Sequence, residues 1–299
     1  MTLENSVFLS GVECDDGRLM MGAQNGSVDI TLTPHSIIKI RTPDPDGAWS
    51  DRGQMKWTSA CVSQNAQNDG VMFLGPYGRW LEMRTDGHSK GDIIPEVDEE
   101  DPPTVFRFLK PIDGQMYAGG LDRYIYQFNG KQWNMISSAQ MLSYPEAGSS
   151  ESLTGFSAEE LYAPGWDGEV WTNHGGDWQR VETPTNLILN DADVLDDKVY
   201  IGGQIGVILE GRGDDWTIIE NDLLEQDIWS VRAFNGAVYF STMSGIMCLK
   251  DGELSVAQVL GPDMRSAMSL FVGPSGLWSV GATDIILFDG SEWFTVAQS

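Results

Sequence analysis

Three repeating features of the sequence predict an all-β fold, a single β-propeller over residues 1–299 with seven four-stranded blades. A short glycine-containing motif recurs seven times, a tryptophan follows it at a nearly fixed distance, and glycine turns separate short apolar runs. No stretch keeps a 3.6-residue apolar period for more than about two turns, so helices should be rare. Six or eight blades are the alternatives to seven.

The recurring motif is an apolar or aromatic residue followed, after two further residues, usually by glycine. Its first positions are Leu19, Met72, Tyr117, Tyr162, Tyr200, Tyr239 and Trp278. These anchors lie 53, 45, 45, 38, 39 and 39 residues apart, which matches the length of a propeller blade. We expect inserted loops at about 35–56, 86–104 and 137–153 to account for the longer early intervals.

A tryptophan stands 13 residues after the motif glycine in three repeats and 12 residues after it in the last. Turns such as Asn129-Gly130 and Asp289-Gly290 lie in between, and they supply the positive φ angles that tight hairpins need. We expect the repeated aromatics to fill the wedges between blades as scaffold. They are Tyr117, Tyr162, Tyr200, Trp133, Trp178, Trp216 and Trp293.

The sixth repeat illustrates how one unit divides into four strands. Apolar runs at 228–234, 237–240, 246–249 and 254–256 are separated by Asn235-Gly236, Ser244-Gly245 and Asp251-Gly252. Strands of this length joined by glycine turns are typical of a propeller blade.

These repeats resemble bacterial propellers of the WD-repeat, YVTN and photosystem-assembly-factor kind. The residues that carry the resemblance are 200–203 with 213–216, and 278–281 with 289–293. The turns also resemble incomplete Asp-boxes of sialidase-like propellers. A looser resemblance links a stand-alone propeller of this kind to immunity proteins of contractile secretion systems. The first resemblance implies the fold, and fold alone does not fix function.

Charge excludes several classes of partner. The chain has 44 acidic and 18 basic residues, a net charge of −26, so we expect no binding to nucleic acid or to anionic membranes. Cys14, Cys61 and Cys248 are too few and too scattered for a disulfide framework. Because no secretory signal or membrane-spanning run is visible, we expect a cytoplasmic monomer.

The sequence offers no pattern for catalysis, and we expect no catalytic residue, no metal and no cofactor. His35, His88 and His174 lack metal-ligand spacing. Residues 44–47 resemble the opening of a calcium loop, but Met55 stands where the loop needs glutamate. A carboxylate pair for glycoside cleavage stays open, since nothing singles one out among so many acids.

The acids are concentrated in two segments. Residues 191–227 contain eleven acids against Lys198 and Arg212, and a second run joins Asp92 to residues 96–101. The simple interpretation is solubility. The alternative is a binding face, because in a propeller the inter-blade loops and the loops between second and third strands open on one side.

That interpretation predicts a set of partner-binding residues, acids with interleaved apolar anchors. They are Asp122, Trp166, Asp167, Glu220, Asp222, Glu225, Asp227, Asp263, Asp284, Glu99 and Glu100. Trp166 is either an exposed anchor or a cap on the central channel.

The function we expect is non-catalytic capture of a basic protein by this acidic face. Its most specific form is an immunity protein that occludes the active site of a bacterial toxin such as a nuclease. The alternatives are a scaffold propeller for a cellular complex, or a glycan-binding or glycan-hydrolysing propeller.

Overall fold

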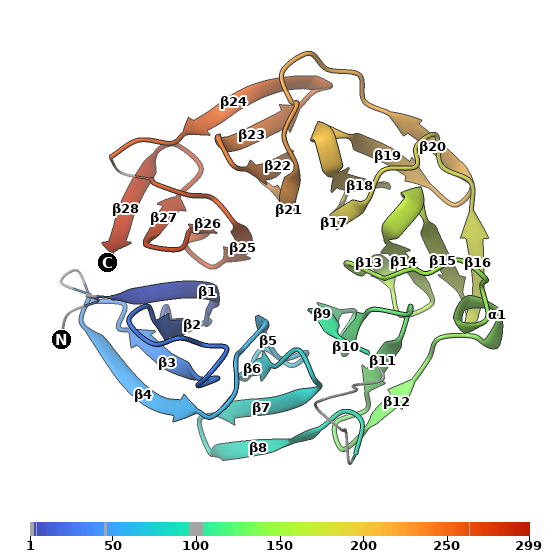
Figure 1. Ribbon diagram of the computed structural model, residues 1–299. Helices are drawn as coiled ribbons and strands as arrows, with labels where there is room; N and C mark the ends of the chain where they lie inside the picture. The colour runs from blue at the N-terminus through green and yellow to red at the C-terminus, as the bar shows by residue number, and fades with distance from the viewer. Residues whose placement is uncertain (1–2, 4, 45–46, 96–103, 263) are drawn as a thin grey trace.

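Seven four-stranded antiparallel sheets, each made of four consecutive strands, surround a central axis (Figure 1). The computed structural model describes residues 3, 5–44, 47–95, 104–262 and 264–299. The predicted all-β, seven-bladed propeller is therefore confirmed, and we number its blades 1 to 7 in chain order. The innermost strand of each blade is its first, and the last strand lies at the rim.

The strand bounds follow the repeats along the chain. Blades 1 and 2 contain β1 (Ser6–Glu13), β2 (Leu19–Asn25), β3 (Ser36–Arg41), β4 (Trp49–Met55), β5 (Cys61–Gln64), β6 (Gly70–Leu74), β7 (Arg79–Arg84) and β8 (Gly87–Asp92). Blades 3 and 4 contain β9 (Phe106–Ile112), β10 (Gln115–Gly120), β11 (Ile125–Phe128), β12 (Trp133–Met135), β13 (Thr154–Ser157), β14 (Glu160–Pro164), β15 (Val170–His174) and β16 (Asp177–Val181). Blades 5 and 6 contain β17 (Leu189–Leu195), β18 (Lys198–Gly203), β19 (Ile208–Arg212), β20 (Asp215–Ile218), β21 (Ile228–Phe234), β22 (Ala237–Thr242), β23 (Gly245–Lys250) and β24 (Glu253–Val259). Blade 7 contains β25 (Ser269–Gly273), β26 (Gly276–Val280), β27 (Asp284–Phe288) and β28 (Trp293–Gln298).

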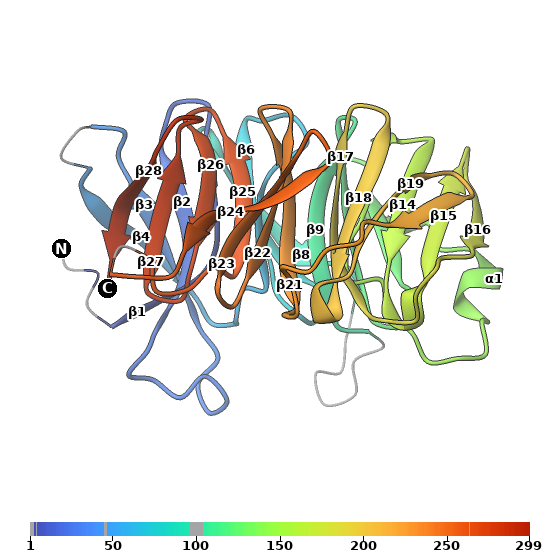
Figure 2. The same ribbon diagram turned by 90° about the horizontal axis from the view of Figure 1, so that it is seen from above.

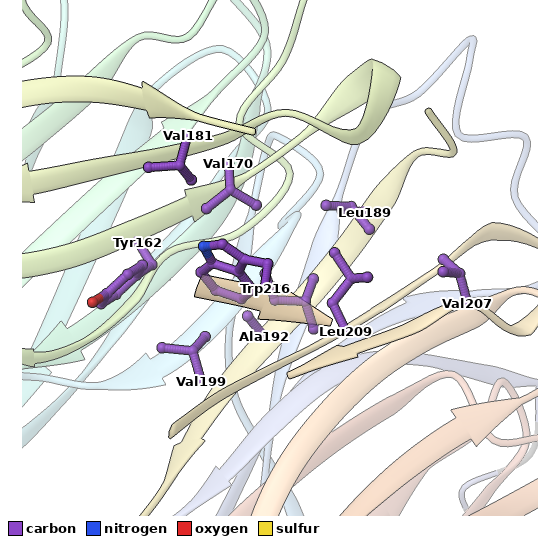
Figure 3. Close-up of a cluster of buried hydrophobic side chains, with 10 residues drawn as sticks. Tyr162, Val170, Val181, Leu189, Ala192, Val199, Val207, Leu209 and Trp216 are labelled. Atoms are coloured by element: carbon purple, nitrogen blue, oxygen red, sulfur yellow. The ribbon is translucent and has the colours of Figure 1, made fainter. Parts of the chain in front are cut away.

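All seven anchors lie in the second strand of a blade, where both faces of the sheet are covered by neighbouring blades. Between blades 4 and 5, Tyr162 packs edge-on against Trp216 with ring centroids 5.9 Å apart. Branched aliphatic residues from both blades fill the rest of this wedge (Figure 3). The repeated aromatics are thus scaffold, because each wedge between blades needs bulky apolar volume.

Blade 1 contains only N-terminal strands and blade 7 only C-terminal ones, so the ring closes without exchange of a strand. Ser6, the first residue of β1, and Ser299 meet where these blades adjoin, since Ser299 Oγ donates to Ser6 O at 2.7 Å. Glu13, only 2% exposed, joins the two blades: its carboxylate accepts from Ser275 N at 2.9 Å, Ser275 Oγ at 2.5 Å and Trp278 Nε1 at 2.8 Å. This buried carboxylate thus holds the seam, together with the main-chain bond from Phe8 N to Ala282 O at 2.8 Å and a shared apolar cluster.

The expected inserted loop at 35–56 is wrong, because these residues form β3 and β4. The extra length of blade 1 comes instead from two long connections, 26–35 and 42–48. Of the other two expected insertions, 86–104 includes β8, and 137–153 includes the helix α1 (Ala139–Leu142). Two single turns, η1 (Trp166–Gly168) and η2 (Gln204–Gly206), complete the helical content of the described chain. No helix in that part is long and apolar enough to cross a bilayer.

Candidate functional site

Two sets of connections open on the same side of the ring, which we call the connecting-loop face. One set joins the second strand of each blade to the third: 26–35, 75–78, 121–124, 165–169, 204–207, 243–244 and 281–283. The other joins successive blades, and it includes 219–227 and 264–268. The remaining turns form the opposite side, which we call the turn face. The edge-on view separates the two faces (Figure 2).

Main-chain hydrogen bonds hold the connecting loops together. The amide of Gln204 donates to Ile188 O at 2.8 Å, Gly168 N to Leu187 O at 2.9 Å, and Asp122 N to Gly148 O at 2.9 Å. The bonds of Gly168 and Asp122 tie a loop within one blade to the segment entering the next blade, and the bond of Gln204 ties the loop of blade 5 to the segment that enters that blade. Side chains on this face therefore project from a fixed backbone, as a preorganised binding surface requires.

Ile205 is the most informative residue of this face. It is 62% exposed and has a φ of 52°, a left-handed conformation that β-branched residues rarely adopt. Asp122 and Asp167 occupy the equivalent position in blades 3 and 4, with φ of 57° and 53°. The amide of Ile205 donates to Asp227 Oδ1 at 2.9 Å, which holds the strained loop. A strained backbone conformation at an isoleucine whose side chain is exposed indicates a functional role for that side chain.

Exposed apolar side chains gather on the connecting-loop face. Of the thirteen large hydrophobic residues exposed in the described chain, ten lie in its connections or within two residues of them. These ten are Ile30, Leu32, Tyr77, Met135, Ile205, Leu223, Trp229, Met243, Val259 and Met268. The other three, Val256, Val272 and Phe294, lie on strands, and none of them is in a turn of the turn face. Sequence reasoning missed most of these residues. Comparing equivalent loop positions would have shown isoleucine where two other repeats have aspartate.

The predicted partner-binding residues are placed unevenly. Asp122, Asp167, Glu220, Asp222 and Glu225 are exposed on the connecting-loop face, and Asp227 is partly buried there. Glu99, Glu100 and Asp263 lie outside the described residues.

Trp166 is neither a fully exposed anchor nor a cap on the central channel. Its indole is partly buried, and Nε1 donates to Glu151 Oε1 at 2.7 Å. Glu151 in turn lines the mouth of the central channel. Trp166 thus supports the channel rim through Glu151.

The prediction that Asp284 binds a partner is wrong. This side chain is fully buried, with 0% exposed, so it does not face a partner. Burial raises its pKa, while the backbone amides of Arg265 and Ser266 act in the opposite direction. Its position at the start of β27 therefore makes it an anchor for the loop that enters blade 7.

The acidic run at 191–227 does not form one patch, which is a second correction. Asp191 and Asp193 line the channel, Asp196, Asp197 and Asp214 lie on the turn face, and only residues 220–227 reach the connecting-loop face. The turn face is itself acidic. Its exposed acids include Asp15, Asp16, Asp69, Asp86, Asp113, Glu159, Asp196, Asp197, Asp214, Asp251, Asp289 and Glu292. Charge alone therefore does not distinguish the faces, whereas the exposed apolar residues do.

The central channel holds an ion cluster that the sequence did not reveal. Asp191 accepts from Lys110 Nζ at 2.9 Å and from Arg232 Nη1 at 2.7 Å. It also accepts from Ser152 Oγ at 2.6 Å, Ser230 Oγ at 3.1 Å and Val231 N at 3.0 Å. The cluster lies between two cavities, of about 370 Å³ toward the connecting-loop face and about 290 Å³ toward the turn face.

The pKa values of the two channel carboxylates, Asp191 and Asp193, are shifted in opposite directions. Burial alone would raise the pKa of Asp191, but Arg232 and Lys110 outweigh it and hold this pKa well below its usual range. Burial dominates at Asp193 and raises its pKa. Because its hydrogen bonds are satisfied and its charges are paired, this cluster has a structural role: it links blades 3, 5 and 6 across the channel.

The described chain offers neither a metal-ligand cluster nor an activated thiol at Cys61. No group of three or more His, Cys, Asp or Glu side chains lies close enough there to hold a metal ion. Burial raises the pKa of Cys61 to about 12, so its thiol is a poor nucleophile.

Comparison with known proteins shows similarity to an immune protein. No protein-family model matches the chain. It is 40% identical over 235 residues to the immune protein Tsi7 of Pseudomonas aeruginosa, which covers 75% of this chain and 74% of that protein.

Among solved structures, the similarity is to propellers and concerns the fold alone. Streptogramin B lyase superposes with a TM-score of 0.72 at 11% identity, covering 95% of this chain and 94% of that one. The WD40 propeller domain of Doa1 gives 0.70 at 12%, covering 95% and 89%. Sqt1 of Saccharomyces cerevisiae gives 0.65 at 11%, covering 98% and 97%.

Proposed function

This chain belongs to the family of the immune protein Tsi7, and we propose that it is a non-catalytic immunity protein that binds and neutralises a toxin. The contact surface is the connecting-loop face around blades 5 to 7. The observation that carries this assignment is Ile205, a β-branched residue held exposed in a left-handed conformation. A left-handed L-residue costs about 1–2 kcal/mol, and aspartate or glycine would adopt this conformation at lower cost, so an isoleucine here favours a use for its side chain.

Neighbouring residues complete a contact surface of the usual composition. Leu223, Trp229 and Met268 are exposed around the same part of the ring, and Trp229 is 45% exposed at the channel mouth. Glu220, Asp222 and Glu225 flank them. Apolar anchors bordered by charge favour a partner whose own surface is basic and carries apolar pockets.

We propose a nuclease as the specific class of toxin, and the cytoplasm as the place of neutralisation. A nuclease cleft is basic because it holds phosphate, so an acidic face can occupy it and exclude the substrate. The three unpaired cysteines are consistent with a reducing compartment.

The decisive experiment substitutes Ile205→Asp, which restores the residue found at the equivalent position of blades 3 and 4. The protein should be at least as stable as the wild type, because aspartate tolerates this conformation better. Toxin binding should weaken by about 10- to 100-fold, since a buried isoleucine contributes ~1.5–3 kcal/mol. The matched control is Val256→Asp, the same kind of change at an exposed position on the outer strand β24.

The toxin is first recovered with the tagged chain from its native host, then purified and tested against both variants by calorimetry and by survival of cells expressing it. Equal affinity and equal protection for the wild type and the Ile205→Asp variant would refute the assignment of this face. Recovery of a large host complex without any toxic component would refute the immunity function itself.

A further inference from the structure

A groove between blades 1 and 2 concentrates positive charge on this otherwise acidic protein. It has a volume of about 870 Å³, within the range of ligand-binding clefts. Five of the 18 lysines and arginines line it, together with one histidine. These residues are Arg52, Lys56, Arg79, Arg84, His88 and Lys90. Asp92 is the one acidic residue of the lining.

Three of these cations are available to a ligand. Arg52, Lys56 and Lys90 are exposed and form no ion pair with any described residue, whereas Arg84 pairs with Glu82 at 2.9 Å. In a chain with more than twice as many acidic as basic residues, each lysine or arginine could readily form an ion pair with an aspartate or glutamate. Cations kept together and unpaired therefore indicate an anionic ligand.

The shape of the groove favours a linear ligand over a single phosphate. The groove follows β7 from Arg79 at one end to Arg84 at the other, about 17 Å for six residues of strand. Lys56 lies at the first end, Lys90 opposite the middle of β7, and Arg52 toward the second end. Positive charge is thus distributed along the groove.

The wall formed by β4 favours a peptide over a nucleic acid. This strand is the free edge of blade 1, and five of its seven residues are exposed. A Cβ at Gly53 would have open space around it, so its main chain is accessible to an added strand. Trp80 is buried and Trp57 half-buried, so neither indole of the lining offers an open stacking platform for bases.

From these contacts we propose that the groove between blades 1 and 2 binds an acidic segment of a partner protein in extended conformation. The segment pairs with the edge of β4, and its carboxylates face Arg52, Lys56 and Lys90. The groove lies across the ring from blades 5 and 6, which carry Ile205, Leu223 and Trp229, so it can be occupied together with that part of the connecting-loop face (Figure 1).

The probe is a fluorescein-labelled octapeptide of alternating glutamate and threonine, with an octapeptide of alternating lysine and threonine as the charge control. The protein should bind the acidic peptide and not the basic control peptide, and its affinity for the acidic peptide should fall as the salt concentration rises. Amides of 52–54 should gain protection in hydrogen exchange when the peptide is bound, as strand pairing requires.

The variant is Arg52→Glu with Lys90→Glu, which should weaken peptide binding about tenfold or more. Its control is Lys131→Glu with Lys250→Glu, the same charge change at two exposed cations outside the groove. Affinity for the toxin should be unchanged in both, which keeps this test separate from the immunity assignment. Peptide binding that is absent, or that the groove variant leaves unchanged, would overturn the proposal. Tighter binding of an oligothymidylate octamer would make the ligand a nucleic acid and overturn it as well.

Discussion

Replacing Asp191 by asparagine tests how strongly the channel cluster joins the blades. The Asp191 carboxylate lies on β17 of blade 5 and binds Lys110 of blade 3 and Arg232 of blade 6. Ser152, which precedes blade 4, donates to it as well. Asparagine has nearly the same volume, so the substitution removes a charge without opening a cavity. It also points an amide donor at groups that are themselves donors.

The magnitude follows from what remains in the channel. Removing one partner of a buried ion pair costs about 3–5 kcal/mol. Lys110 and Arg232 keep 18% and 21% of their side-chain surface exposed, and Asp193 stays nearby, so we expect about 2–4 kcal/mol. For a domain of this size that corresponds to a fall in Tm of about 3–6 °C.

The dependence on pH identifies the charge as the cause. Because the folded pKa of Asp191 is lowered, its stabilisation is present above the unfolded pKa of about 3.9 and is lost as pH falls toward the folded value. The stability difference between wild type and variant should therefore shrink by about 1.4 kcal/mol per pH unit below 3.9. Asp193 has the opposite sign, since its raised pKa stabilises the fold on protonation.

Urea unfolding followed by tryptophan fluorescence, at pH 7 and pH 3, measures both effects. Ser152→Ala is the comparison, because it removes one neutral donor to the same carboxylate and keeps both ion pairs. It should cost about 1.5 kcal/mol at pH 7, less than the Asp191→Asn variant. This smaller cost should also shrink at pH 3, because Ser152 helps to lower the pKa of Asp191. Equal stability of wild type and the Asp191→Asn variant at pH 7 would refute the reasoning. A loss that does not change between pH 7 and pH 3 would show that packing, not charge, is responsible.

Three further outcomes are expected. Glu13→Gln should lower the free energy of unfolding by about 1.5–3 kcal/mol, and hydrogen exchange should rise first in β1 and β25, where the ring closes. Arg123→Lys should cost about 2–4 kcal/mol in urea unfolding, because lysine cannot reproduce the paired 2.7 Å bonds of the buried guanidinium to Glu169. Burial raises the pKa of Cys14 to about 11 and of Cys61 to about 12, so iodoacetamide at pH 8 should label them slowly unless urea is present.

The fold was predictable because each blade repeats a local pattern. An aromatic or apolar anchor, glycine turns and a later tryptophan recur at nearly constant spacing, and their positions follow from short-range geometry alone. The bounds of blade 1 were not predictable, because its added length is divided between the connections 26–35 and 42–48. Spacing between anchors reports the total length of an insertion and says nothing of where it lies.

The site was only partly predictable, because a charged residue looks the same in sequence wherever it points. Asp191 was counted with surface acids, yet its partners Lys110 and Arg232 are 81 and 41 residues away. Asp284 appeared to be a loop acid and is a buried anchor. Glu13 and Ser275, which close the ring, are separated by 262 residues. Such contacts follow from ring geometry rather than from any local pattern.

The acidic and the apolar residues act over different distances, so they should contribute differently to binding. Charge acts over a screening length of about 8 Å at physiological salt, so acids on both faces draw a basic partner toward the molecule. Apolar contact acts only where side chains touch, and most of the exposed large apolar residues lie at the connecting-loop face. Reversing Asp196 and Asp197 on the turn face should therefore slow association at low salt and leave dissociation unchanged. Removing the Ile205 side chain should do the reverse, because affinity differences within one interface arise mainly in dissociation.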